Sequence, residues 1–183
     1  MNVARLAAKS FGSVPVAVID SGQLTLGVGL AVVDAAQRAL AGAHLSEVVE
    51  AVRSRVARTW TFAGLATVEF LRRSGRLSRF QYELAALLRI LPLLKMHEGE
   101  ADMERVRTHR RAMHRVVELA SELGPLEGLA IVHTNAREQA SQMLRRVSDL
   151  VPAGASPLFG QVTPVIGAHI GPGAAGVVCV AKN

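Results

Sequence analysis

The sequence has few aromatic residues, a single cysteine and no long uninterrupted hydrophobic run. Phenylalanine, tyrosine and tryptophan make up only 4% of its 183 residues, so the platforms on which single-stranded nucleic acids stack are missing. Cys179 can form no disulfide within the chain and lies in an apolar run, which indicates a buried residue of a cytoplasmic protein. The longest apolar stretch, residues 84–94, contains Arg89 and Pro92 and is too short to cross a bilayer.

Motifs for catalysis and for metal binding are also missing. None of the six histidines has the spacing from cysteines or carboxylates that is typical of zinc or iron sites. No serine stands in a Gly-x-Ser-x-Gly elbow and no cysteine accompanies a histidine as a nucleophile pair, so we expect no enzymatic activity. His133 is expected to be hydrogen-bonded at a strand end, whereas His44 and His97 are expected on surface loops.

Charge is present, but it is mainly positive. The formal net charge is +6 at pH 7, and arginines concentrate in residues 72–79 and 105–115. Without aromatic residues, zinc spacing or a helix-turn-helix pattern, a nucleic-acid partner is not indicated. A localised basic surface is better suited to an anionic ligand, a phosphate-bearing partner or an acidic protein surface. Stable insertion into a membrane is not expected either.

The sequence alternates between segments typical of strands and segments typical of helices. Apolar, β-branched or hairpin-like patterns predict strands; they occur at residues 14–19, 61–65, 93–96, 101–106 and 129–132. Helical spacing of apolar residues or a capping residue predicts helices; these comprise residues 24–40, residues 67–73 and the segments that begin at Ser46, Ser78, Thr108 and Asn135. Such alternation is typical of an α/β fold.

The most distinctive motif is the run Gln-Val-Thr-Pro-Val-Ile-Gly-Ala-His-Ile-Gly-Pro-Gly-Ala at residues 161–174. Its His169 is followed by a turn with Gly171 and Gly173, just before the apolar strand predicted at residues 177–180. Glycines let a backbone approach a ligand closely, and proline stiffens the turn. Two interpretations are open: a preset loop that presents one imidazole at an apolar site, or an ordinary loop between two strands with a surface histidine.

Four short segments, in the same order along the chain, resemble the DegV family of bacterial fatty-acid-binding proteins. They are residues 14–22 together with 26–30, residues 68–77, residues 106–108 and the run around His169. Since they extend over nearly the whole chain, the sequence is identified as a member of this family. The resemblance implies a truncated, DegV-like two-domain α/β fold. Residues 1–58 would be the C-terminal part of an incomplete first domain, and residues 59–183 a complete second domain.

The resemblance also implies a function. Family members bind a long-chain fatty acid between the two domains and present its carboxylate to a fatty-acid kinase, which forms acyl phosphate for phospholipid synthesis. The fatty acid is the ligand, and no cofactor or metal is implied. Family members begin with a further strand-rich stretch that supplies hydroxyl donors, which we expect to be removed here or to belong to a separate polypeptide. The alternative is a shortened member that no longer binds lipid and acts as a protein-interaction module.

The family match suggests four ligand-binding residues. His169 is the first candidate for the carboxylate, and Gly171 and Gly173 shape its turn. Arg73 is the candidate at the mouth of the lipid tunnel, although arginines at a helix end also suit the unpaired carbonyls there. One departure is Ile170, where the family more often has a small hydroxyl residue, so no second hydrogen bond to the head group is expected at that position.

The resemblance suggests docking residues as well. Arg105 and Arg107 are the candidates for contact with the kinase, since the second lies in one of the matching segments. We expect them to belong to a basic surface that consists of Arg105, Arg107, Arg110, Arg111 and Arg115. A solvated helix face with no partner is the alternative.

Overall fold

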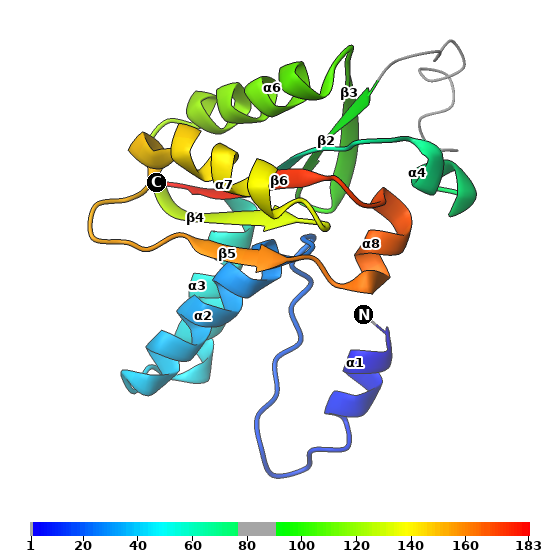
Figure 1. The fold of residues 1–183 in the computed structure, drawn as a ribbon. Coiled ribbons are helices and arrows are strands. Elements are labelled where there is room, and N and C mark those ends of the chain that lie inside the picture. The colour runs from blue at the N-terminus through cyan, green and yellow to red at the C-terminus, as the bar shows by residue number, and fades with distance from the viewer. Residues whose placement is uncertain (1, 77–90) are drawn as a thin grey trace.

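A mixed sheet of six strands organises the part of the chain that the computed structural model describes, residues 2–76 and 91–183 (Figure 1). The strand order is β3-β2-β1-β6-β4-β5. Only β4 and β5 run parallel; every other neighbouring pair is antiparallel. The strands are β1 Thr59–Gly64, β2 Leu91–His97, β3 Glu100–Val106, β4 Leu126–His133, β5 Leu158–Gln161 and β6 Ala175–Ala181.

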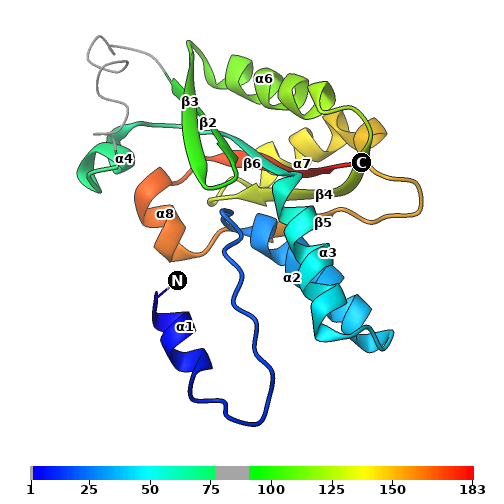
Figure 2. The ribbon, with the colours of Figure 1, turned by 180° about the vertical axis from the view of Figure 1, so that it is seen from behind.

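Helices cover both faces of this sheet. Helices α6 and α7 pack on one face, while α2 packs on the other and carries α3 beside it (Figures 1 and 2). The helices are α1 Asn2–Ala8, α2 Leu26–Leu40, α3 Leu45–Ala57, α4 Glu69–Arg73, α6 His109–Glu122, α7 Arg137–Arg146 and α8 Pro164–Ile170. A 3₁₀ turn spans Ser148–Leu150. The α/β prediction is confirmed; the helix predicted from Ser78 lies outside the described residues.

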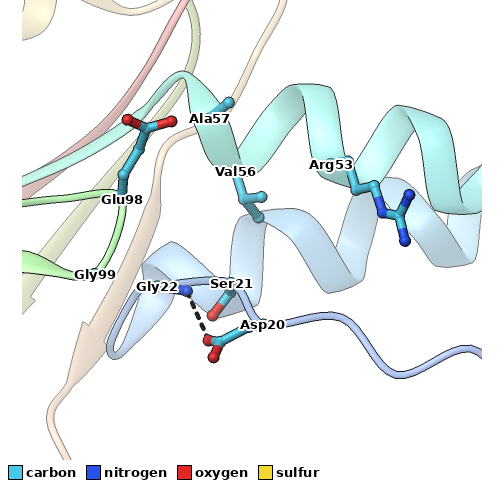
Figure 3. Close-up of a pocket in the computed structure, with 8 residues that line it drawn as sticks. All are labelled: Asp20, Ser21, Gly22, Arg53, Val56, Ala57, Glu98 and Gly99. Atoms are coloured by element: carbon cyan, nitrogen blue, oxygen red, sulfur yellow. Dashed lines mark hydrogen bonds between the residues drawn. The ribbon is translucent and has the colours of Figure 1, made fainter. Parts of the chain in front are cut away.

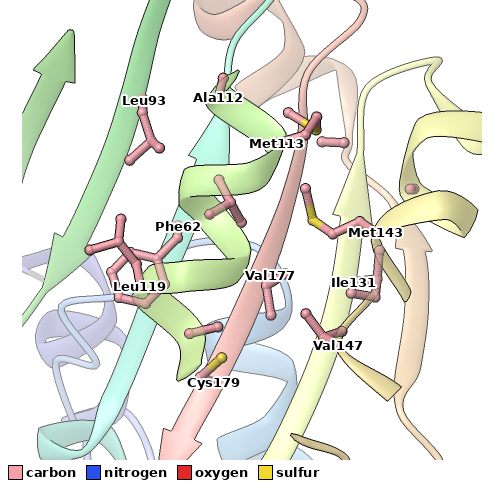
Figure 4. Packing of buried hydrophobic residues seen from close by; sticks show 14 of the residues in the cluster. Phe62, Leu93, Ala112, Met113, Leu119, Ile131, Met143, Val147, Val177 and Cys179 are labelled. Carbon is pink, nitrogen blue, oxygen red and sulfur yellow. The ribbon is translucent and has the colours of Figure 1, made fainter. Parts of the chain in front are cut away.

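Strand β6 lies at the centre of the core, and its residues alternate between two apolar layers. Val177 and Cys179 pack beneath α6 and α7 (Figure 4). Val178 and Val180 point to the other face, where they pack with Leu30 of α2. Because both faces of the strand are covered, every position can be apolar, which explains its uninterrupted hydrophobic sequence. Burial raises the pKa of the Cys179 thiol to about 12, so the side chain stays a neutral thiol.

The segment before α2 is tied to the sheet through Gln23. Its side-chain amide donates to the carbonyl oxygen of Thr59 at 2.8 Å, and its Oε1 accepts from the hydroxyl of Thr61 at 3.0 Å. The ion pairs that join α3 and the residue after it to β4 are Arg55–Glu127 and Arg58–Glu127. These contacts join residues on the two sides of the predicted boundary between residues 1–58 and 59–183, and the boundary stays a prediction. All six strands of the described sheet lie within residues 59–183.

Residues 14–19 do not form the buried strand that their sequence predicts. They are extended, but no described strand pairs with them, and the side chains of Val14 and Val16 are 60% and 46% exposed. An apolar, β-branched run forms a strand only where a neighbour satisfies its backbone groups. The buried strand that the local pattern predicts is therefore absent, while an unpaired, exposed run is what is expected if residues 1–58 are part of an incomplete domain, since residues 2–76 and 91–183 provide no such neighbour.

The N-termini of α6 and α3 differ in how well they match the predicted caps. Thr108 caps α6 as predicted, since its hydroxyl accepts from the N–H of Arg111 at 3.1 Å. Ser46 does not cap α3. The helix already begins at residue 45, and the Glu47 carboxylate accepts from the N–H of His44 at 2.7 Å.

Two histidines lie on the strands of the sheet. At the end of β4, the Nδ1 of His133 accepts from the N–H of Ala136 at 3.3 Å, which confirms a hydrogen-bonded strand end. Burial, with a contribution from nearby positive charge, lowers the pKa of His133 and favours this neutral acceptor. Asn135, with φ of 47°, lies in the turn and does not cap α7. His97 is half-buried in β2 and stacks on Trp60 with ring centroids 3.6 Å apart, so its prediction as loop surface was wrong.

Candidate functional site

His169 lies in the last turn of a helix, not in a loop between two strands. Helix α8 begins at Pro164, a residue whose fixed φ suits a first helical position. The N–H of Gly171 still donates to the carbonyl of Gly167 at 2.8 Å, which completes the last turn. The sequence did not suggest this helix, since its glycine, valine and isoleucine residues have low helix propensity.

The turn after α8 requires glycine at two positions. Gly171 and Gly173 have φ of 74° and 86°, values that other residues rarely adopt. A Cβ atom on Gly171 would overlap the ring of Phe70, and one on Gly173 would lie 2.9 Å from the Cβ of Ala66. The backbone of this turn therefore lies directly against the segment that leads from β1 into α4, and the end of α8 is held in one place.

Thr134 anchors the same turn from the end of β4. Its buried hydroxyl donates to the carbonyl of Gly171 at 2.6 Å and accepts from the N–H of Ala174 at 3.0 Å. Its own N–H donates to the carbonyl of Ala174 at 2.9 Å, and its carbonyl accepts from the N–H of Gly173 at 2.7 Å. Sequence reasoning missed this residue; the available signal was a threonine directly after a predicted strand.

The His169 ring has an unpaired polar atom, and the residue after it packs on apolar side chains. Its Nδ1 is buried and has no hydrogen-bond partner anywhere in residues 2–76 and 91–183. The next residue, Ile170, packs on an apolar cluster at this end of the sheet. The cluster consists of Ala63, Leu65, Leu71, Met103 and Ala174, with Leu94 beside it. Buried polar atoms in native proteins normally have partners, so this unpaired nitrogen marks a candidate ligand position.

Thr25, directly before α2, is a second residue with an unpaired buried polar atom. Its hydroxyl oxygen is buried without a partner among the described residues, and it does not cap the helix. Its φ of 51° is unusual for a β-branched residue. The following residue, Leu26, has a side-chain atom 3.4 Å from where a Cβ of Gly160 in β5 would lie. Such local strain is often found at functional sites, and nothing in the sequence pattern pointed to it.

Arg73 lies on a helix next to that of His169, but its charge already has a partner. Helices α4 and α8 pack side by side (Figure 1). The Arg73 side chain is 70% exposed and pairs with the Glu69 carboxylate at 2.6 Å. Hydrogen bonds from Arg72 and Arg73 lower the pKa of Glu69 to about 2. Only the Nε of Arg73 bonds to this carboxylate, so its terminal nitrogens can donate to a ligand while the pair stays formed.

Of the arginines in the predicted basic surface, Arg105 and Arg107 are exposed at the end of β3 and directly after it. Neither forms an ion pair with any described residue. Arg115 differs, because its guanidinium is held by carboxylates on β3 and α6. Its partners are Glu122 at 2.7 Å, Glu104 at 3.0 Å and Glu118 at 3.3 Å. These bonds raise the pKa of Arg115, and the bond to Glu122 contributes most. Arg115 therefore does not contribute a free charge to the predicted basic surface.

A polar hollow lies at the opposite end of β1 (Figure 3). It measures about 360 Å³ and lies between α3, the β2–β3 turn and the loop at Asp20. Gly99 donates to the carbonyl of Gly22 at 3.0 Å and closes one side. None of the predicted site residues lines it. Within the described ranges, no group of three or more histidine, cysteine or acidic residues could hold a metal ion, and no helix is long and apolar enough to cross a membrane.

Comparison with known proteins decides the family. A family model described as the uncharacterised DegV family matches residues 1–182. The chain belongs to the DegV family. A DegV domain-containing protein of Streptomyces coelicolor is 36% identical over 168 residues, which are 90% of this chain and 60% of that protein. The chain thus spans about three-fifths of the length of this relative.

Solved structures of the DegV family match the fold over its whole length. The structure of a family member from Corynebacterium glutamicum is 30% identical, with a TM-score of 0.87, and the match covers 100% of this chain and 70% of that one. A family member from Thermus thermophilus, whose structure is described by its fatty-acid binding, is 25% identical with a TM-score of 0.86. That match covers 99% of this chain and 66% of the Thermus chain.

Proposed function

We propose that this chain provides part of a fatty-acid-binding site, with the head group near His169 and the acyl chain on the apolar cluster beside Ile170. The observation that carries the proposal is the unpaired, buried Nδ1 of His169, the residue directly before Ile170, which packs on that cluster. The fatty-acid binding described for the Thermus relative supports the same ligand class. The role is one of binding and presentation, not of catalysis.

The energetics of a fatty acid match these surroundings. Each buried methylene contributes about 0.8 kcal/mol, so an apolar channel supplies affinity in proportion to acyl-chain length. A carboxylate is costly to bury without hydrogen-bond donors. His169 supplies a donor, and the anchored turn of Gly171 and Gly173 holds it in position. The terminal nitrogens of Arg73 supply a second donor. Further hydroxyl donors come from the strand-rich segment that other family members have, and the ligand lies between residues 1–58 and 59–183.

The second step of the proposed function is presentation of the bound carboxylate to a fatty-acid kinase for acyl-phosphate formation. Arg105 and Arg107 support it, because both are exposed and without ion pairs in the described chain. Exposed charges at the rim of an interface mainly raise the association rate and its salt sensitivity. Kinase turnover with Arg105→Ala and Arg107→Ala variants should therefore fall more at low salt than at moderate salt. Unchanged turnover at both salt levels, with fatty acid bound, would remove both residues from the interface.

Lipid binding itself is tested in two measurements. Denaturing extraction of the purified chain followed by mass spectrometry should detect long-chain fatty acid. Displacement of a fluorescent fatty acid should then show about tenfold weaker binding for His169→Ala, the loss expected for a charge-assisted hydrogen bond. The exposed His44, on the far end of α3, provides the matched His44→Ala control. An extract without fatty acid, together with equal affinities of all three proteins, would favour the protein-interaction module instead.

A further inference from the structure

Helices α6 and α7 carry arginines whose charges are not balanced within the described chain. Arg110 and Arg111 on α6 and Arg145 and Arg146 on α7 are exposed and form no ion pair there. Six other arginines have carboxylate partners, whereas Arg105 and Arg107 have none among the described residues; the six are Arg38, Arg55, Arg58, Arg72, Arg73 and Arg115. Arg110 and Arg111 also lie in the first turn of α6. Positive charge there opposes the helix dipole and destabilises the helix by several tenths of a kcal/mol for each residue.

Three of these arginines, Arg110, Arg111 and Arg146, border a groove along the line where α6 and α7 meet. Two hollows of about 490 Å³ and 250 Å³ share Arg110 and Arg146. The larger one also includes Arg111, His114 and Val117, and the smaller one Met113, Gln139, Gln142 and Met143. The groove therefore has basic edges, an apolar floor of valine and methionine, and amide groups that can donate or accept hydrogen bonds.

We propose that this α6–α7 groove binds an acidic segment of a partner protein, with carboxylates on the guanidinium groups and an apolar side chain on the floor. Guanidinium groups bind carboxylates with two parallel hydrogen bonds. Methionines adapt their shape to apolar side chains of different form. A free phosphate would use the arginines but not the floor, and a nucleic acid would find no aromatic residue in either hollow.

The groove is separate from the proposed fatty-acid site, but it shares Arg110 and Arg111 with the basic surface predicted to dock the kinase. Arg105, Arg107 and His169 line neither hollow. Helices α6 and α7 lie on the face of the sheet opposite to α2 and α3 (Figures 1 and 2). A partner in the groove therefore leaves the fatty-acid site uncovered, and binding there does not depend on the lipid.

The chain offers a matched pair of variants for the test. Arg146 borders both hollows, whereas its neighbour Arg145 borders neither, and both are exposed in the last turn of α7. The probe is a fluorescently labelled hexapeptide, Glu-Leu-Glu-Glu-Leu-Glu, followed by anisotropy. Arg146→Glu should weaken its binding about tenfold or more, as expected for a close charge pair. Arg145→Glu, with the same net charge, should change it less than about twofold.

Two further probes test the chemistry of the groove. Replacing both leucines of the peptide by serine should weaken binding, since the floor then loses its apolar contact. Inorganic phosphate should displace the original peptide no better than sodium chloride of equal ionic strength. The proposal would be overturned by no binding of the original peptide, by equal weakening from both variants, by undiminished binding of the serine peptide, or by specific displacement with phosphate.

Discussion

Two apolar, valine-rich runs of this chain have opposite structural fates. Residues 177–180 form the centre of β6 and are fully buried. Residues 14–19, also apolar and rich in valine but with Pro15 among them, are extended but unpaired, and Val14 and Val16 are largely exposed. The comparison teaches that an apolar, β-branched pattern specifies the capacity to form a strand. Neighbouring strands and covering helices determine whether it becomes one.

The surroundings of the two runs explain the difference. Strand β6 pairs with β1 on one side and β4 on the other, and helices cover both of its faces. Residues 14–19 are covered on one side only. Their last residues border an apolar hollow of about 300 Å³ with α2 and α3, which includes Ala17, Ile19, Val28, Val32 and Val48. Their open side resembles a sheet edge that has no neighbour in the described structure.

The largest expected effect comes from a charge in the buried run. Val178→Asp places a carboxylate in the apolar layer between the sheet and α2, so the free energy of unfolding should fall by more than about 4 kcal/mol. Urea unfolding followed by circular dichroism measures this loss. Val178→Ala is the control, because it leaves a cavity without burying a charge and should cost less. A stable Val178→Asp protein would show that β6 is not the centre of the core.

The turn that leads into β6 should be the next most sensitive. Gly171→Ala forces a side chain into a backbone region that is almost restricted to glycine and against the ring of Phe70. We expect a loss of about 3 kcal/mol of unfolding free energy. Gly167→Ala, inside α8 with open space around it, should instead stabilise by about 0.5 kcal/mol. Equal effects of the two substitutions in urea unfolding would contradict the tight packing of this turn.

A smaller loss is expected where Thr134 holds the same turn. Thr134→Val keeps the shape of the side chain but removes one hydrogen bond to the carbonyl of Gly171 and one from the N–H of Ala174. We expect a loss of about 2 kcal/mol. Fatty-acid affinity should fall with it, because the end of α8 loses its support. Thr134→Ser retains the hydroxyl and should preserve both quantities; if it behaves like the valine variant, the hydroxyl does not hold the turn.

Much of the fold could be predicted because its signals are local. The hairpin of β2 and β3 followed from the turn around Gly99, and α6 followed from the cap at Thr108 and an apolar stripe. The whole run of residues 161–174 was recognised as distinctive. Its conformation was not, because the helix there depends on Phe70 and Thr134, which lie far away in the sequence.

The candidate site was less accessible to sequence reasoning for the same reason. Burial of the Nδ1 of His169, the strain at Thr25 and the pairing of Arg73 with Glu69 all arise from the packing of separate segments. The basic surface was predicted by counting arginines, but Arg115 is neutralised by carboxylates, one of them on a neighbouring strand. A count of charges cannot distinguish a free guanidinium from one already bonded within the fold.

The smallest expected effect completes the comparison between the two runs. Val16→Asp should change the free energy of unfolding by less than about 0.5 kcal/mol, since this side chain is exposed and its backbone has no strand partner among the described residues. Urea unfolding at several protein concentrations measures the effect and also detects association. A loss of about 2 kcal/mol or more that grows with protein concentration would mean that residues 14–19 pair with a second copy in solution. In that case the two runs would differ in the source of their neighbouring strand and not in whether they have one.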